Sequence, residues 1–224
     1  MGIVDTRSLA ATVDAVNEAF FYGQRLAKSE RARAAKWIAS RQGKPYSYAE
    51  MFAPTDKDYL EGFRVFTGER IRSGAATGHI LGEEASRALI LLDVRDDRVA
   101  RALNCATEGM MGRLVRSRTP GMYCCGPCSV SLWRHLVVGG LEEPEKRLRD
   151  GMRSLKAHRD GEGKWRRFPF YYTLLALAEV QLPSALVEMK YAAPVAERLL
   201  KRCVLKDDYA KRRRDLLMRV VAKV

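Results

Sequence analysis

The sequence lacks an apolar run long enough to cross a membrane, and its start lacks the basic residues and apolar block of an export signal. These absences predict a cytoplasmic protein without a membrane span. A phosphate-binding loop, a dinucleotide fingerprint and a serine nucleophile elbow are also missing, so the common nucleotide-binding and hydrolase classes are not indicated. Alternating apolar and polar residues never extend far enough to indicate a sheet, which leaves helices as the predicted framework.

Cysteine is scarce, with five residues in 224. The odd count, the uneven spacing and the missing export signal argue against a disulfide framework and for a reducing compartment. The five residues are Cys105, Cys124, Cys125, Cys128 and Cys203.

Acidic residues are also few, with 27 Asp and Glu against 40 Lys and Arg, for a net charge of +13. Residues 144–167 and residues 198–224 hold nearly all of this excess. Such concentrated positive charge suits an anionic partner, either nucleic acid or an acidic protein, whereas solvated faces of amphipathic helices are the simpler interpretation. The candidate polyanion-binding residues are Arg147, Arg153, Arg166, Arg167, Arg212, Arg213 and Arg214.

Helical periodicity runs through most of the chain. Apolar side chains recur every three or four residues in 6–21, which predicts a helix with one buried face. A later helix is predicted to begin at Asp56 or Asp58 and to continue into residues 66–74. Pro194 is predicted to interrupt the helical segments near the C-terminus.

Two segments about 42 residues apart resemble each other. Aligned without a gap, residues 118–136 and 160–178 match Gly121 with Gly163, Tyr123 with Trp165, Pro127 with Pro169, and Leu132 with Leu174. A weaker copy begins at Gly78. Such periods predict stacked helical hairpins, in which a charged outer helix leads through a glycine loop to an apolar inner helix. We therefore expect an all-α fold with one helical-hairpin repeat domain over residues 1–224, its clearest repeats being 75–117, 118–159 and 160–200.

The segments DGEGKWRRFPFYYTLLALAEV (160–180) and RTPGMYCCGPCSVSLWRHLVVGGL (118–141) resemble the turn and inner helix of the squalene cyclase and protein prenyltransferase β-subunit superfamily. This resemblance implies a partial α/α toroid or an open superhelix, with a cavity ringed by inner helices that takes a small or extended apolar ligand. The zinc ligands of the prenyltransferases and the aspartate cluster of the cyclases cannot be placed in this chain. The resemblance therefore implies a fold and a ligand cavity, not the activity of the family, and leaves open whether the chain is an enzyme.

Several polar and aromatic residues of the predicted inner helices are candidates to line that cavity. Glu83 lies one helical turn after His79 and shares its face, so burial would favour acid–base work by this carboxylate or an ion pair with a neighbouring cation. The full set of candidates is His79, Glu83, Cys125, Cys128, His135 and Tyr171.

The motif Cys125-Gly-Pro-Cys128 is the most specific motif in the chain, and Cys124 precedes it. At a helix N-terminus the first thiol of such a pair is expected to have a lowered pKa, as in thiol redox proteins. Alternatively, Cys124, Cys125 and Cys128 form a soft metal site for zinc or iron, with His135 or Cys105 as a further ligand. The third interpretation is that the thiols simply pack in the core. No other cofactor is predicted.

Overall fold

The computed structural model describes residues 2–117 and 119–224. Arg118, the first residue of the predicted second repeat, lies outside the described residues, as does Met1 at the start of the predicted domain. The described chain is all-α apart from one very short antiparallel strand pair, which confirms the predicted fold class. No helix in these two ranges is long and apolar enough to span a membrane.

The chain divides into two compact units, and each is described by itself. The first comprises residues 1–65, 70–116 and 138–142, and the second comprises 66–69, 117–137 and 143–224. The first unit holds α1 (Leu9–Phe21), α2 (Lys28–Ala39), α3 (Asp56–Glu61), β1 (Phe63–Arg64), β2 (Arg70–Ile71), α4 (Gly74–Leu92) and α5 (Asp97–Leu114). The second unit holds α6 (Gly126–Val137), α7 (Pro144–Ala157), α8 (Phe170–Glu179), α9 (Pro183–Lys201) and α10 (Asp208–Lys223).

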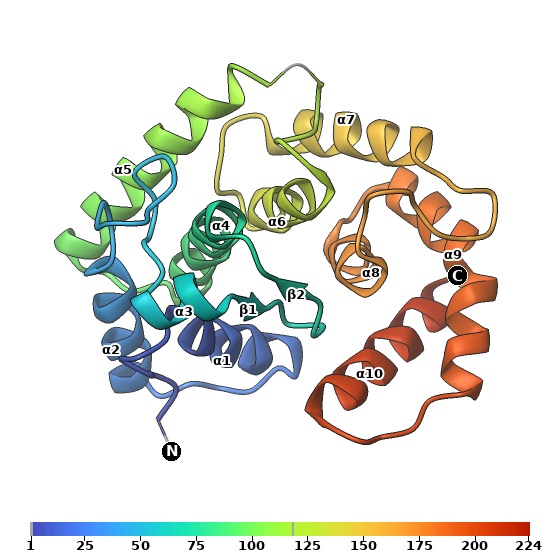
Figure 1. The fold of residues 1–224 in the computed structure, drawn as a ribbon, viewed down its shortest axis with the longest axis horizontal. Helices are drawn as coiled ribbons and strands as arrows, with labels where there is room; N and C mark the ends of the chain where they lie inside the picture. The colour runs from blue at the N-terminus through green and yellow to red at the C-terminus, as the bar shows by residue number, and fades with distance from the viewer. Residues whose placement is uncertain (1, 118) are drawn as a thin grey trace. The chain divides into compact units, whose positions relative to one another are not determined.

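In the first unit the apolar helix α4 packs against α1, α2 and α5 (Figure 1). Ser73 caps its start by accepting a hydrogen bond from the amide of Ala76, and Asp93 ends it in the left-handed conformation at φ 48°. Asp96 then caps α5 by accepting from the amides of Arg98 and Val99. Helix α4 is buried on nearly all sides, and it buries the charged side chains Glu83, Glu84 and Arg87 together with its apolar residues.

The prediction of one helix from Asp56 into residues 66–74 is wrong. Helix α3 ends after six residues at Gly62, whose φ of +71° belongs to the left-handed region. A Cβ atom at Gly62 would lie 2.3 Å from the carbonyl oxygen of Ile71, so only glycine allows the chain to approach β2 this closely. The following residues pair as β1 and β2, with Phe63 opposite Ile71.

In the second unit, α6 packs on both α7 and α8 (Figure 1). Helix α9 likewise packs on both α7 and α8. Helix α10 contacts both α8 and α9. Close packing of α7 on α6 depends on Gly151, where a Cβ atom would lie 2.3 Å from the indole nitrogen of Trp133. This arrangement holds α6, and with it Cys128 in its first turn, within the packed part of the unit.

Candidate metal centre at the start of α6

The start of α6 is fixed by hydrogen bonds and by close packing. The Ser129 hydroxyl donates to the carbonyl oxygen of Cys125 at 2.7 Å and accepts from the amide of Tyr123 at 3.0 Å. Gly126 faces the loop before α8, where a Cβ atom would lie 2.1 Å from the carbonyl oxygen of Arg167. The residues on both sides of Cys124 and Cys125 are thus anchored, which limits the positions that these thiols can take.

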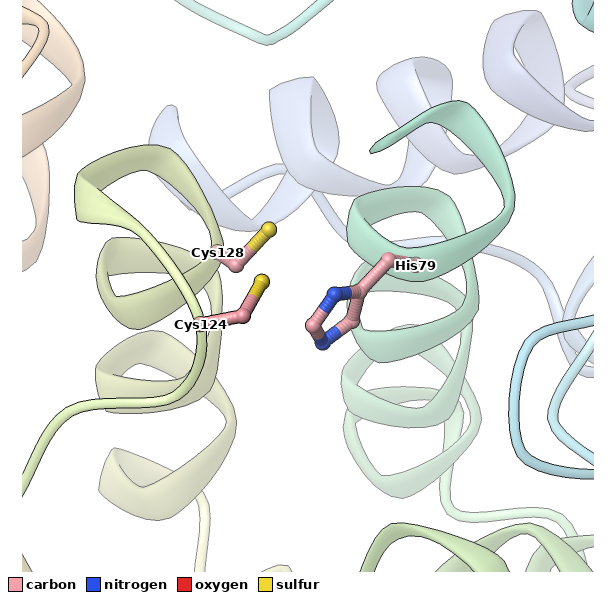
Figure 2. Close-up of side chains that lie close together, drawn as sticks. All are labelled: His79, Cys124 and Cys128. Carbon is pink, nitrogen blue, oxygen red and sulfur yellow. The ribbon is translucent and has the colours of Figure 1, made fainter. Parts of the chain in front are cut away.

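Three thiols gather at this helix start. The Cys125 and Cys128 Sγ atoms are 3.2 Å apart, and the Cys124 Sγ lies within 4.8 Å of the Cys128 Sγ. Figure 2 shows the Cys124 and Cys128 side chains on the same side of α6. Cys128 is buried, whereas Cys124 and Cys125 are exposed to solvent. We call Cys124, Cys125 and Cys128 the thiol cluster.

The thiol cluster does not have the electrostatics of an activated nucleophile. The hydrogen bond with Cys124 raises the pKa of the Cys125 thiol, burial raises it further, and the hydrogen bond with Cys128 acts in the opposite direction. The expectation of a lowered pKa is therefore wrong, because the hydrogen bond with Cys124 and the partial burial of the Cys125 thiol outweigh the hydrogen bonds with Cys128. Only the thiolate form is nucleophilic, so the raised pKa makes thiol–disulfide exchange at Cys125 slower than at a thioredoxin-like cysteine.

The spacing of the cluster fits a soft metal ion. Two sulfur atoms bound to one tetrahedral zinc ion lie about 3.8 Å apart, since each Zn–S bond is about 2.3 Å long. This separation falls between the 3.2 Å of one thiol pair and the 4.8 Å limit for the other. Small side-chain rotations would bring Cys124, Cys125 and Cys128 to the separations that zinc requires.

His135 is not part of the thiol cluster. It lies on α6 seven residues after Cys128, which places it about 10 Å further along the helix axis. Its side chain is fully buried. The expectation that His135 joins the cysteines as a ligand is therefore wrong, because two full helical turns separate them.

His79 and Glu83 form a pair on α4 within the first unit. The His79 Nε2 atom lies 3.5 Å from the Glu83 Oε1 atom, and both side chains are almost fully buried. The imidazole ring also stacks on Tyr48, with 4.1 Å between the ring centroids. The sequence correctly predicted that the two residues share a face; Figure 2 shows His79 projecting from α4.

The remaining cavity-lining candidate, Tyr171, lies on α8 in the second unit. Its ring is half-buried beneath the guanidinium of Arg213, 4.7 Å from the ring centroid. Burial raises the pKa of the Tyr171 hydroxyl, and the positive charge of Arg213 partly offsets this rise. This residue therefore serves as a packing platform for α10.

The candidate polyanion-binding residues differ in their surroundings. Arg212 is buried and donates to the carbonyl oxygen of Phe66, Arg213 donates to that of Thr67, and Arg214 pairs with Asp215. The guanidinium groups of Arg212 and Arg213 therefore hold α10 on its own unit, whereas the Arg214 pair lies within α10. By contrast, the exposed candidates are Arg153 on α7 and Arg166 and Arg167 in the loop before α8, while Arg147 on α7 is half-buried.

Two ion pairs of the second unit, each with one buried partner, are not indicated by the sequence. Glu188 accepts two hydrogen bonds from the Arg159 guanidinium, at 2.8 and 3.0 Å, and one from the Trp165 indole at 2.9 Å. Arg134, which is 2% exposed, donates to both carboxylate oxygens of Glu179. The partners are 29 and 45 residues apart, so no local pattern could have signalled either pair.

Comparison of the chain with known protein families, with curated proteins and with solved structures gives no match. The functional argument therefore rests on the chemistry of the residues described above.

Proposed function

We propose that the chain is a metal-binding protein whose thiol cluster holds one soft divalent ion, with zinc as the best fit. The observation that carries the proposal is that two thiols lie close to the Cys128 Sγ atom, Cys125 at 3.2 Å and Cys124 within 4.8 Å. Thiolate ligands select soft or borderline ions, and zinc tolerates a site of three protein ligands with a fourth position open to water or another donor. Iron–sulfur clusters commonly use four cysteines, so zinc is preferred.

The exposure of the cluster also suits a metal site. Cys124 and Cys125 are open to solvent while Cys128 is buried. A metal ion can therefore reach the site without unfolding the chain, and water can occupy the fourth position. Binding would convert the protonated thiols to thiolates and release their protons, so the affinity should rise with pH.

Elemental analysis of purified protein with single Cys→Ser substitutions tests this proposal. We expect about one zinc ion per chain, and C124S, C125S and C128S should each weaken zinc binding by about 100-fold. This figure follows because structural zinc binding of roughly 10–16 kcal/mol is shared among four ligands. C203S is the matched control, since Cys203 lies outside the cluster, after α9. Zinc-free protein that also fails to take up added zinc or cobalt would refute the proposal.

A histidine scan identifies the fourth ligand. The chain has three histidines; H79Q and H158Q are assayed for zinc affinity, and H135Q is the control, because His135 lies two helical turns from Cys128. His158 already contacts the Ser154 carbonyl oxygen through Nδ1 at 2.8 Å. Unchanged affinity in all three variants would assign the fourth position to water or to another oxygen donor.

A second candidate function, apolar ligand binding, rests on a cleft within the second unit. The cleft has a volume of about 490 Å³ and is lined by Leu136, Val137, Pro144, Glu145, Leu148, Glu179, Gln181 and Leu182. The six predicted cavity-lining residues are not among them. Retention of an apolar ligand in native mass spectrometry, and its loss on a Leu148→Asp substitution in this cleft, would support this function.

A further inference from the structure

The Cys125 and Cys128 pair of the thiol cluster has a second chemistry besides metal binding. The 3.2 Å between Cys125 and Cys128 exceeds a disulfide bond of about 2.05 Å by little more than 1 Å. Rotation about the side-chain bonds covers such a distance without moving the backbone, since Cys125 immediately precedes α6 and Cys128 lies in its first turn. The two residues are therefore positioned to oxidise.

We propose that Cys125 and Cys128 form a reversible disulfide that controls metal binding at the thiol cluster. The regulatory part of this inference rests on the proposed zinc site. The disulfide itself does not, because it needs only the two thiols and an oxidant.

The oxidant that fits this pair is a low-molecular-weight disulfide such as oxidised glutathione. The thiolate of exposed Cys125 attacks one sulfur of the oxidant and forms a mixed disulfide with it, while the other sulfur leaves as the first glutathione thiolate. The thiolate of buried Cys128 then attacks the Cys125 Sγ atom and expels the second glutathione. Two protein thiols and one oxidised glutathione thus become one protein disulfide and two reduced glutathione molecules, with the protons carried by the two products.

The order of attack follows from the burial of the two thiols. Cys128 is 1% exposed, so a bulky oxidant cannot reach it, whereas Cys125 is open to solvent. Cys128 is therefore the resolving cysteine, shielded until Cys125 carries the mixed disulfide. This division of roles makes the internal disulfide, rather than a lasting glutathione adduct, the expected product.

Oxidation and metal binding exclude each other at this site. The sulfur atoms of a disulfide carry no thiolate charge, so oxidation removes two of the three ligands and leaves only Cys124. Conversely, zinc coordinates both thiolates, so neither can attack the oxidant. At a free zinc concentration of 100 Kd the metal-free fraction falls about 100-fold, and oxidation should slow by the same factor.

The experiment uses the full chain, reduced and metal-free, in glutathione buffers of graded redox ratio. After alkylation the sample is digested with trypsin, which leaves all three cluster cysteines in one peptide, residues 119–134. We expect this peptide to lose the mass of two hydrogen atoms and to carry the alkyl group on Cys124. Fragmentation locates that group and so distinguishes the Cys125–Cys128 bond from a bond that involves Cys124.

Variants and metal content make the outcomes decisive. C124S should still form the disulfide, whereas C125S and C128S should not. In zinc-loaded protein, oxidation should release the ion in step with thiol loss. Alkylation of Cys125 and Cys128 to the same extent as Cys105 across the whole redox range would overturn the proposal. A disulfide in a protein that never binds zinc would refute the metal function alone, and zinc binding without a disulfide would refute the switch alone.

Discussion

Glu188 is the residue on which the packing of α9 against the loop after α7 depends. It is 2% exposed, and its carboxylate accepts two hydrogen bonds from Arg159 and one from Trp165. A buried carboxylate is stable only when such partners replace its lost hydration. The cation and the indole hydrogen-bond donor would in turn lose their buried acceptor if the charge were removed.

Replacing Glu188 with Gln should therefore destabilise the protein. The amide keeps the size of the side chain, but its NH2 group cannot accept a hydrogen bond. At least one of the bonds from Arg159 and Trp165 is therefore lost, and the negative charge opposite Arg159 is removed. We expect the free energy of unfolding to fall by about 1–3 kcal/mol, measured by urea denaturation with tryptophan fluorescence. E197Q is the matched control, because Glu197 lies on the same helix and is exposed. Equal stability of E188Q and E197Q would show that the buried pair contributes nothing net.

The sequence predicted that the cysteines of the thiol cluster come together, but not how the pKa of Cys125 shifts. The Cys-x-x-Cys spacing and the adjacent cysteine predicted a soft ligand set at a helix start, and the structure brings these thiols together. The direction of the Cys125 pKa shift could not be predicted, because it depends on which sulfur atoms donate hydrogen bonds to which. Such pairings are set by side-chain rotamers, on which a sequence pattern carries no information.

Among the elements, the glycine loops between helices have specific packing roles. Gly121 and Gly163 both adopt positive φ, at +73° and +88°, and each lies against a helix. A Cβ atom at Gly121 would lie 2.0 Å from the Gly151 amide nitrogen on α7, and one at Gly163 would lie 2.6 Å from Val195 on α9. These two glycines are the pair that the sequence alignment matched, and they share a conformation and a kind of contact.

A comparison of two glycines in one loop separates backbone strain from packing. Gly161 and Gly163 both have positive φ, at +92° and +88°, but a Cβ atom at Gly161 would meet nothing within 4 Å. G161A should cost only the backbone strain of about 1 kcal/mol. G163A should cost about 1–3 kcal/mol more, because the added methyl group pushes α9 away.

The two variants are compared in the same urea denaturation assay, with the wild-type chain as reference. A free energy of unfolding that is equal in G161A and G163A would mean that α9 shifts without cost. The packing role of Gly163 would then be rejected, and only its conformational role would remain.

The helices themselves were largely predictable, and the errors have local causes. Periodic apolar residues predicted the segment around α1 correctly. Pro194 was expected to interrupt the chain but lies inside α9, which continues from Pro183 to Lys201. Interior proline costs a helix about 3 kcal/mol, and burial of Ala192, Val195 and Ala196 on either side of it offsets that cost. Packing of this kind is decided by partner helices, which a window of sequence does not contain.

Across the whole chain, the positive charge belongs mostly to one unit. Residues 144–167 and 198–224, which carry nearly all of the net +13, both lie in the second unit. Part of this charge has an internal role, since Arg212 and Arg213 bind backbone carbonyl oxygens of residues 66 and 67. Sequence alone could not separate these arginines from Arg166 and Arg167, because the separation depends on which face of α10 packs inward.

We therefore expect any polyanion binding to depend on Arg166 and Arg167 in the exposed loop before α8. We expect R166Q/R167Q to weaken binding to a single-stranded oligonucleotide and to reduce the slope of log K against log salt concentration by about 1–2. Each lost phosphate contact removes roughly 0.7–0.9 from that slope. Fluorescence anisotropy titrations from low to physiological salt measure it.

The control for this prediction removes the same charge elsewhere. Lys28 and Lys44 are exposed and lie in the first unit, so K28Q/K44Q lowers the net charge equally without touching the loop. A loss of slope confined to R166Q/R167Q would assign the phosphate contacts to that loop. Equal losses in both variants would instead indicate attraction by net charge alone, and binding that does not change with salt would exclude phosphate contacts by these arginines. In either of the last two cases the basic segments would serve as solvated helix faces, as their amphipathic patterns also allow.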